Sequence, residues 1–131
     1  MYLTIDYNSG IPVSAQIIAQ VKYLVVSGEL RPGERIPSVR GLAGRLKLNP
    51  TTVARIYRQL EAEEIICTQP GRGTFIARGR SGLTLAEKRR RLVGTVRELV
   101  VESGRIGMDY GELVKLLESE IRKIEKNERE P

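Results

Sequence analysis

The 131-residue sequence predicts a mainly α-helical fold with one small β-hairpin, divided into two domains. Apolar residues recur at the i, i+3, i+4, i+7 spacing of an α-helix in five segments. Two short runs of β-type residues flank a single Pro/Gly-rich turn, which is typical of a β-hairpin. A stretch of arginine, glycine and serine follows the hairpin. We therefore expect a domain at residues 1–77, a linker at 78–83 and a second domain at 84–131.

Composition indicates a globular protein with an anionic partner. Hydrophobic residues make up 40% of the chain and charged residues 29%, which is typical of globular proteins and not of disordered ones. The formal net charge is +6. Residues 1–82 contain 11 Lys/Arg against 6 Asp/Glu, whereas residues 83–131 contain 11 against 10. The positive excess therefore falls in the N-terminal part of the chain, as phosphate binding requires.

The composition also excludes several classes of function. The chain has no histidine and a single cysteine, Cys67, which lies in an apolar run and is expected to be a small buried core residue. These counts exclude His-based catalysis, ordinary zinc ligation and an intrachain disulfide. We expect no enzyme activity, no metal and no cofactor. Without a signal-peptide pattern or an apolar run of about 20 residues, we expect a cytoplasmic protein with no membrane partner.

The first 36 residues are expected to form an arm, a scaffold helix and a connector. Residues 1–6 alternate apolar and polar side chains, which predicts a short strand or an extended arm. Pro12 begins a helix, and Gly28 ends it as a left-handed cap. The apolar face of this helix consists of Val13, Ile17, Val21, Leu24 and Val25. The proline and glycine residues that follow interrupt any helix up to residue 37.

Residues 37–60 predict two helices separated by a turn of only a few residues. Their apolar faces are Val39, Leu42, Ala43 and Leu46 in the first helix, and Val53, Ile56, Tyr57 and Leu60 in the second. We expect Ser38 to cap the first helix and Asn49 the second, with Pro50 at the first helical position. Periodicity alone leaves two interpretations open, an ordinary helical hairpin and a DNA-binding helix-turn-helix.

The outward face of the second helix favours DNA recognition. Near its start it carries Thr51, Thr52, Arg55 and Arg58. Hydroxyl and helix N–H groups bind phosphates, threonine methyls contact thymine, and arginine can bond guanine with two hydrogen bonds. The acidic residues come only after Leu60, so we expect that end of the helix to lie away from the duplex.

The predicted β-hairpin is interpreted as a wing. Its tip, residues 69–73, holds one charged residue, Arg72, between Gly71 and Gly73. After a helix-turn-helix, such a tip is suited to contact phosphate or enter the minor groove; a solvated loop is the alternative. The expected fold class is thus mainly α with a small β wing: a winged helix-turn-helix DNA-binding domain plus a C-terminal helical hairpin.

Two further amphipathic helices are predicted after the linker. A capping box at residues 84–87 begins the first, Gly104 stops it, and the second begins near Asp109. A hairpin of under 50 residues rarely stabilises itself, so we expect its apolar faces to pack on the same hairpin of a second copy, giving a homodimer. The alternative is a hairpin folded back on its own N-terminal domain. The expected dimerisation residues are Leu92, Val96, Leu99, Leu113, Leu117 and Ile121.

The order and spacing of the motifs resemble the GntR family of bacterial winged helix-turn-helix transcription regulators. The motifs are LRPG (residues 30–33), IPSVR (36–40), LNPTTV (48–53), YRQLE (57–61) and GRGTF (71–75). Asn49-Pro50 and the short two-helix C-terminal part resemble the YtrA subfamily. The resemblance implies a homodimeric regulator, usually a repressor, which binds an inverted-repeat operator in double-stranded DNA.

The resemblance also implies which residues contact DNA. They are Ser38, Arg40, Asn49, Thr51, Thr52, Arg55, Arg58, Gly71 and Arg72. Pro50 stands where many relatives carry arginine, so base readout is expected to depend more on Arg55 and Arg58.

Two points stay open in the sequence. The C-terminal hairpin leaves little room for a pocket of several hundred Å3. An effector small molecule, which the sequence does not identify, would therefore have to bind at the dimer interface or between the domains. The alternative class of function is a protein-interaction module whose helices dock a protein partner and whose arginines form only a solvated surface.

Overall fold

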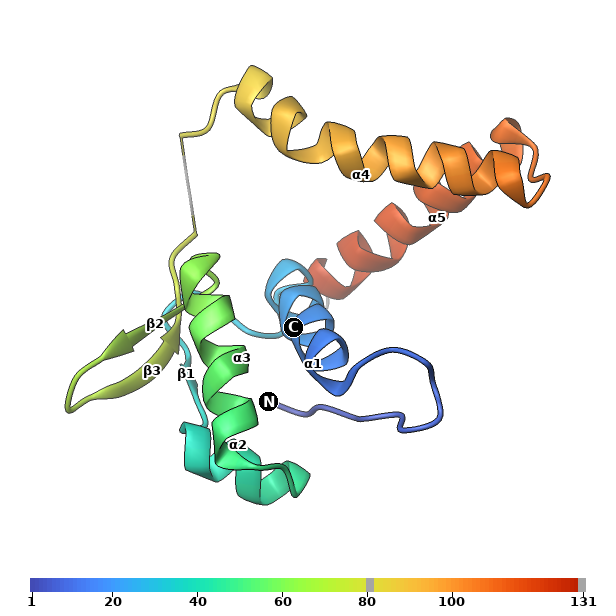
Figure 1. Ribbon diagram of the computed structural model, residues 1–131. Coiled ribbons are helices and arrows are strands. Elements are labelled where there is room, and N and C mark those ends of the chain that lie inside the picture. The colour runs from blue at the N-terminus through green and yellow to red at the C-terminus, as the bar shows by residue number, and fades with distance from the viewer. Residues whose placement is uncertain (80–81, 130–131) are drawn as a thin grey trace. The chain divides into compact units, whose positions relative to one another are not determined.

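The computed structural model describes residues 1–79 and 82–129, with side chains described up to residue 126. The chain divides into an N-terminal unit, residues 1–79, and a C-terminal unit, residues 80–131. Figure 1 shows three helices and a small sheet in the first unit and two long helices in the second. The mainly helical fold class is confirmed. No helix in the described ranges is long and apolar enough to cross a membrane.

The N-terminal unit is built around α3 (Pro50–Ala62), which packs on α1 (Val13–Val26), α2 (Val39–Leu46) and the sheet. The apolar positions expected from the helical spacing supply the core. Its fully buried aliphatic side chains are Ile17, Val21, Leu42, Val53, Ile56, Leu60, Ile66 and Ile76. Each such burial stabilises the fold by about 1.5–3 kcal/mol, so α3 is fixed rigidly at the centre of this unit.

The predicted helix ends are confirmed by their hydrogen bonds. Ser38 Oγ accepts the backbone N–H of Gly41 at 3.0 Å, and Asn49 Oδ1 accepts that of Thr51 at 2.8 Å. Lys47 ends α2 in the left-handed conformation with φ 55°, which turns the chain sharply before Asn49. The tight turn between α2 and α3 therefore depends on one left-handed residue, Lys47, and one side-chain cap, Asn49.

The sheet has one strand more than the sequence predicts. Strand β3 (Gly73–Ile76) lies between β2 (Ile66–Gln69) and β1 (Arg35–Ile36), and both pairings are antiparallel. β1 falls in the segment expected to be an irregular connector. A strand of two residues is too short to show an alternating pattern. It forms because β3 offers a free edge and because Ile36 is 3% exposed in the core.

The N-terminal segment is an extended arm and not a strand, which selects one of the two expectations. Gln20 holds it with two bonds: its Oε1 accepts the N–H of Thr4 at 2.9 Å, and its Nε2 donates to Thr4 O at 2.6 Å. Gln16 does the same with the N–H and the carbonyl of Asp6, at 2.9 and 2.8 Å. Two side-chain amides thus satisfy backbone groups of the arm that a strand partner would otherwise satisfy.

The C-terminal unit consists of α4 (Leu85–Arg105) and α5 (Tyr110–Arg129). Thr84 caps α4 as expected, since its Oγ1 accepts the N–H of Glu87 at 3.2 Å. The expected stop at Gly104 is wrong, because α4 continues to Arg105 and the left-handed residue is Gly107, with φ 76°. A Cβ at Gly104 would lie 3.1 Å from Tyr110 Oη, so this glycine makes room for the start of α5.

The two C-terminal helices cover little of each other. Ser103 and Leu113 are buried near the connecting loop, and beyond that point the helices diverge (Figure 1). Leu113 is therefore mostly covered within its own chain, unlike the other residues expected to form a dimer. Those five are 43–60% exposed: Leu92, Val96, Leu99, Leu117 and Ile121.

Candidate nucleic-acid interface

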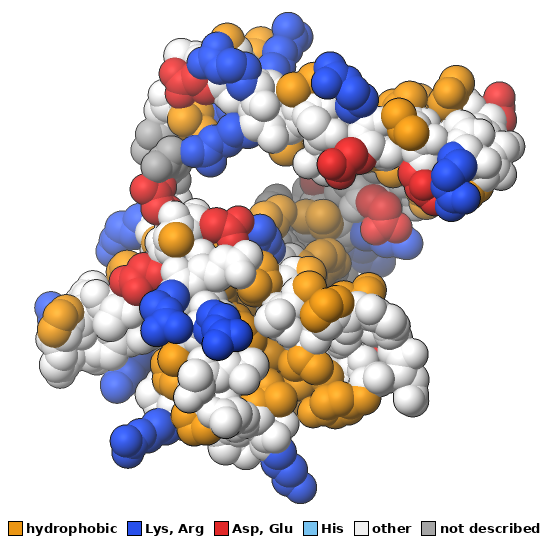
Figure 2. Space-filling model, in the orientation of Figure 1, with side chains coloured by type: hydrophobic (Ala, Val, Ile, Leu, Met, Phe, Trp, Pro, Cys, Tyr) orange, Lys and Arg blue, Asp and Glu red, His pale blue; other side chains and the backbone are white. Residues whose placement is uncertain are grey.

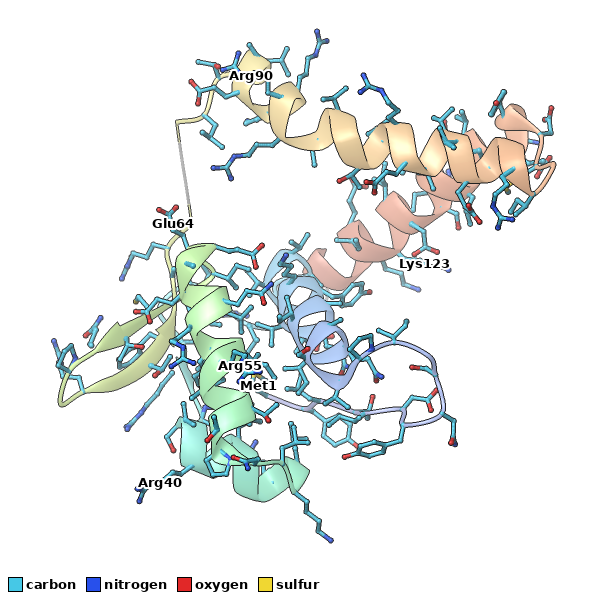
Figure 3. All side chains as sticks on the ribbon, viewed as in Figure 1. Met1, Arg40, Arg55, Glu64, Arg90 and Lys123 are labelled. Carbon is cyan, nitrogen blue, oxygen red and sulfur yellow. The ribbon has the colours of Figure 1, made fainter. Side chains whose placement is uncertain are left out.

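The predicted DNA-contacting residues lie on α2 and its cap, on α3 and its cap as far as Arg58, and on the wing, β2–β3. Among them, Thr52 is half-buried and the others are exposed: Ser38, Arg40, Asn49, Thr51, Arg55, Arg58, Gly71 and Arg72. Figure 3 shows Arg40 extending away from α2 and Arg55 on α3. The N-terminal half of α3 and the cap of α2 thus present cations, hydroxyls and an amide to solvent.

Two acidic side chains of the N-terminal unit have partners within the fold. At the end of α3, Glu63 forms an ion pair with Lys22 of α1 at 2.9 Å, and Lys22 lowers the pKa of the Glu63 carboxyl. Glu61 Oε1 accepts the N–H of Thr68 in β2 at 3.2 Å. These two carboxylates therefore hold the unit together at the end of α3 farthest from the turn.

The arginines of the candidate interface have no such partners. Among the side chains that the structure describes, no hydrogen bond or ion pair engages the guanidinium of Arg40, Arg55, Arg58 or Arg72. Each guanidinium carries five N–H donors in a planar fork suited to phosphate and to guanine. Their donors are available to a ligand without breaking a contact of the fold.

One expected source of phosphate contacts is missing at the start of α3. Pro50 has no N–H, and the N–H of Thr51 donates to Asn49 Oδ1. The N–H groups of Thr52 and Val53 donate to Asn49 O at 3.0 and 3.2 Å. The expectation of free N–H groups at this helix end is therefore wrong. The donors that remain there are the Thr51 and Thr52 hydroxyls and the Asn49 amide NH2.

Tyr57 has a role that the apolar pattern did not reveal. Its ring is 6% exposed, and its hydroxyl donates to the carbonyl of Pro37 at 2.6 Å. Burial raises the pKa of Tyr57 to about 12, while the nearby Arg45 acts in the opposite direction. The hydroxyl therefore keeps its proton. It ties the middle of α3 to the residue before the Ser38 cap, which fixes the start of α2, and with it Arg40, relative to α3.

The wing has a second arginine that sequence reasoning missed. At its tip, Gly71 adopts φ 75° and the N–H of Arg72 closes the turn onto Gln69 O at 2.9 Å. On the neighbouring strand β1, Arg35 pairs with Phe75 of β3, and its guanidinium lies against Gly73 at the tip end of that strand. A Cβ at Gly73 would be 2.9 Å from Arg35 Nε, so glycine is needed for this close approach. The glycine after Arg72 could have suggested such a neighbour.

Within the described residues, the structure offers no alternative site for metal chemistry, because no three His, Cys, Asp or Glu side chains gather to hold an ion. The sequence predicts that Cys67 is a buried core residue, but this residue is only half-buried. The alternation of β2 turns Ile66 into the core and Cys67 toward the opposite face.

Comparisons with known proteins agree with this geometry. The family model described as "Bacterial regulatory proteins, gntR family" matches residues 13–76. The HTH-type transcriptional repressor YtrA of Bacillus subtilis (strain 168) is 33% identical over 129 residues, which cover 96% of this chain and 99% of that protein. This chain belongs to the GntR family. The resemblance to the YtrA-like members of the family is confirmed.

Solved structures show the same fold for GntR regulators. A protein of Listeria monocytogenes EGD-e described as a transcriptional antiterminator superposes with a TM-score of 0.83 at 34% identity, covering 95% of this chain and 92% of that one. YtrA from Sulfolobus acidocaldarius, a GntR-family transcription factor, gives 0.60 at 31% identity, covering 77% and 98%. The protein is thus a DNA-binding transcriptional regulator with a winged-helix fold, and not an enzyme.

Proposed function

We propose that this GntR regulator is a homodimeric repressor that binds an inverted-repeat operator, one half-site per subunit. The observation that carries the proposal is a set of arginines on α2, α3 and the wing whose guanidinium groups have no hydrogen-bond or ion-pair partner among the described side chains. At the far end of α3, by contrast, Glu61 and Glu63 are engaged in contacts within the fold. Such a separation orients the protein on a polyanion, because only one end of α3 attracts it.

The residues divide by the chemistry each can supply. Arg55 and Arg58 lie one helical turn apart on the exposed face of α3, so both are suited to base edges in the major groove. Thr51, Thr52 and Asn49 surround the helix start, where their hydroxyls and amide can bind phosphate. Arg40 then contacts the duplex beside α3, at a position fixed by the Ser38 cap and by Tyr57.

The wing supplies the remaining contacts. Arg72 at the glycine-bounded tip is suited to the narrow minor groove or its phosphates. We add Arg35 to the contact set, because its guanidinium lies against Gly73 at the tip end of β3 and is engaged by no carboxylate among the described residues. Arg72 and Arg35 thus both place positive charge near the tip of the wing.

The exposed apolar faces of α4 and α5 support the dimer. Leu85, Leu92, Val93 and Val96, with the stems of Lys88 and Arg89, line a groove of about 520 Å3 on α4. Leu92 and Val96 are two of the three dimerisation residues expected on this helix, and the third, Leu99, continues the same face. We propose that the hairpin of a second copy fills the groove, because an apolar surface of this extent is seldom left in water.

Repression is proposed from the relatives. YtrA and NagR of Bacillus subtilis are both named transcriptional repressors. Binding of a dimer to two half-sites occludes the promoter it covers, which needs no further domain. An effector small molecule is not needed for this proposal, and any such ligand stays unidentified.

The direct test is selection of bound duplexes from a random DNA pool, followed by fluorescence anisotropy on the selected duplex and on a scrambled one. We expect an inverted repeat, tight binding that weakens steeply with salt, and a loss of about 1–3 kcal/mol for Arg40→Ala. Lys22→Ala is the matched control, since it removes one cation at the opposite end of α3. Selection of unrelated sequences, or equal losses for both variants, would contradict the proposal.

A further inference from the structure

We propose that the first two turns of α4 form a second DNA-contacting surface, which binds the phosphate backbone without reading its sequence. This basic quartet consists of Lys88, Arg89, Arg90 and Arg91. The inference rests on the proposed binding of an operator by the N-terminal unit. It adds a polyanion-binding surface to the C-terminal unit, which so far has only a dimerisation role.

The distribution of charge along the chain identifies this segment. Residues 1–77 contain 9 Lys/Arg against 6 Asp/Glu, a net charge of +3. Residues 78–91 contain 6 against 1, a net of +5, and residues 92–131 contain 7 against 9, a net of −2. The highest density of positive charge along the chain therefore falls at residues 78–91, which include the first two turns of α4. Figure 2 shows Lys and Arg side chains on this part of α4.

The quartet is a cluster of four consecutive cations without ion pairs. Elsewhere on α4 and α5, Glu102–Arg105, Glu112–Lys115 and Glu120–Lys123 form ion pairs, each three residues apart. Arg97, Arg122 and Lys126 are also without an ion pair among the described side chains, but none of them has a second unpaired cation beside it in the sequence. Among the described side chains no carboxylate pairs with any member of the quartet, although Glu87 precedes it. One carboxylate cannot neutralise four cations, so the positive charge of this surface stays available to a ligand.

Helix stability does not explain why four cations lie at the start of α4. Cations stabilise a helix at its C-terminal end, where they meet the negative end of the macrodipole, and these four lie at the opposite end. Consecutive residues are about 100° apart, so the four side chains surround the helix and do not converge on one pocket. Figure 3 places Arg90 on these first turns. This arrangement suits an extended polyanion better than a small anionic molecule.

The length of the connecting chain permits contact with the same duplex. The N–H of Ala77 donates to Ile65 O at 2.9 Å, which fixes the end of the wing beside the end of α3. Seven residues then lead to Thr84, a reach of roughly 25 Å in an extended chain. The 13 residues of α3 span only about 20 Å. The quartet can therefore reach phosphates flanking the half-site that α3 occupies.

The test compares two variants with the same loss of charge. The first replaces the quartet: Lys88→Gln, Arg89→Gln, Arg90→Gln and Arg91→Gln. The control replaces four exposed cations of α5: Lys115→Gln, Arg122→Gln, Lys123→Gln and Lys126→Gln. Anisotropy on the selected and the scrambled duplex is measured over a range of KCl concentrations. Circular dichroism and sedimentation measure the fold and the oligomeric state of both variants, because Lys88 and Arg89 also line the groove on α4. If the fourfold variant dissociates, Arg90→Gln with Arg91→Gln replaces it, since neither residue lines that groove.

In the quartet variant only, we expect the plot of log affinity against log salt to become less steep. The magnitude of its slope should decrease by about 0.9 for each phosphate that the variant no longer neutralises, or about 2–4 per subunit. The ratio of affinities for selected and scrambled duplex should stay within about twofold. An unchanged slope, or an equal fall in the control, would overturn the inference. So would a collapse of that ratio, because the quartet would then read sequence.

Two provisions keep the test decisive. If the fourfold variant does not fold, Arg90→Gln with Arg91→Gln should give about half the fall in slope, and no fall would overturn the inference. If the parent protein itself does not distinguish the selected from the scrambled duplex, the proposed operator binding fails. The comparison of slopes on scrambled DNA still decides the role of the quartet in that case.

Discussion

The two units of this protein use similar amphipathic helices with opposite results. In the N-terminal unit, the apolar face of α3 is fully covered: Val53, Ile56 and Leu60 are each at most 2% exposed. In the C-terminal unit, α4 and α5 are longer, yet Leu92 and Val96 are more than half exposed. The difference shows that helical periodicity predicts which side chains form an apolar face, but not whether the same chain or another molecule covers that face. The chain itself buries the apolar face of α3, whereas the apolar faces of α4 and α5 stay exposed in the single chain.

The largest effect is expected in the core of the N-terminal unit. Leu60→Ala should lower the free energy of unfolding by about 2–5 kcal/mol, because it removes a fully buried side chain and leaves a cavity. Chemical denaturation followed by circular dichroism measures the loss, which should not depend on protein concentration. Leu117→Ala on α5 is the comparison, and its loss should vary with concentration if a dimer covers that residue. Equal and concentration-independent losses would remove the distinction between the units.

The alkaline stability of the protein should depend on Tyr57. The pKa of Tyr57 is about 12 in the folded protein against an ordinary 10, so the unfolded chain loses this proton first as pH rises. The stabilisation is complete below pH 10 and is lost between about pH 10 and 12, amounting to roughly 2–3 kcal/mol. Denaturant titrations at several pH values should show this fall in the parent protein and a smaller one in Tyr57→Phe. Parallel curves for the two proteins would show that burial does not raise the pKa of Tyr57 in the folded protein.

A charge placed on the exposed face of α4 tests whether a second copy covers it. Val96→Glu should raise the dissociation constant of the dimer by about 30-fold or more, equivalent to about 2 kcal/mol, because it would bury an unpaired carboxylate. Analytical ultracentrifugation over a concentration series measures this shift. Val101→Glu is the matched control, since Val101 is similarly exposed but lies on the opposite side of the helix. A monomeric parent protein, or an equal effect of both variants, would refute the proposed interface.

The smallest predicted effect concerns Arg35 on β1, beside the wing. Arg35→Ala should weaken binding of all duplexes by about 1 kcal/mol and reduce the salt slope by about 1, as expected for one phosphate contact. Anisotropy on selected and scrambled DNA measures both quantities. Arg31→Ala, which removes an exposed cation outside the wing, should change neither. An Arg35 variant that binds like the parent protein would remove Arg35 from the proposed contact set.

The sequence predicted those features that are encoded by residues close together in the chain. Ser38, Asn49 and Thr84 cap the expected helices because each acts on a backbone N–H two or three residues away. The stripe of α3 and the wing followed from local spacing in the same way. All these elements fall in regions where composition, periodicity and turn residues agree.

The features that the sequence did not predict depend on contacts between distant residues. β1 forms because it pairs with the edge of β3, about 40 residues later in the chain, and the hydrogen bond from Tyr57 to Pro37 spans 20 residues. Gly104 resembles a helix stop, but its small size accommodates Tyr110. The approach of Arg35 to Gly73 likewise needs the folded sheet. None of these contacts leaves a periodic signal, so only the three-dimensional structure identifies the residues that orient the site.

The cap formed by Asn49 and Pro50 has a consequence for how such regulators diversify. Asn49 caps the start of α3, and the bond from Tyr57 together with the core side chains fixes the buried face of this helix. The exposed residues of α3 before its last turn are therefore not needed for folding. If Thr51, Arg55 and Arg58 contact DNA as proposed, substitutions at these three positions change the DNA preference at little cost in stability. A duplicated gene with this architecture can acquire a new target by changing a few surface codons, while its scaffold stays the same.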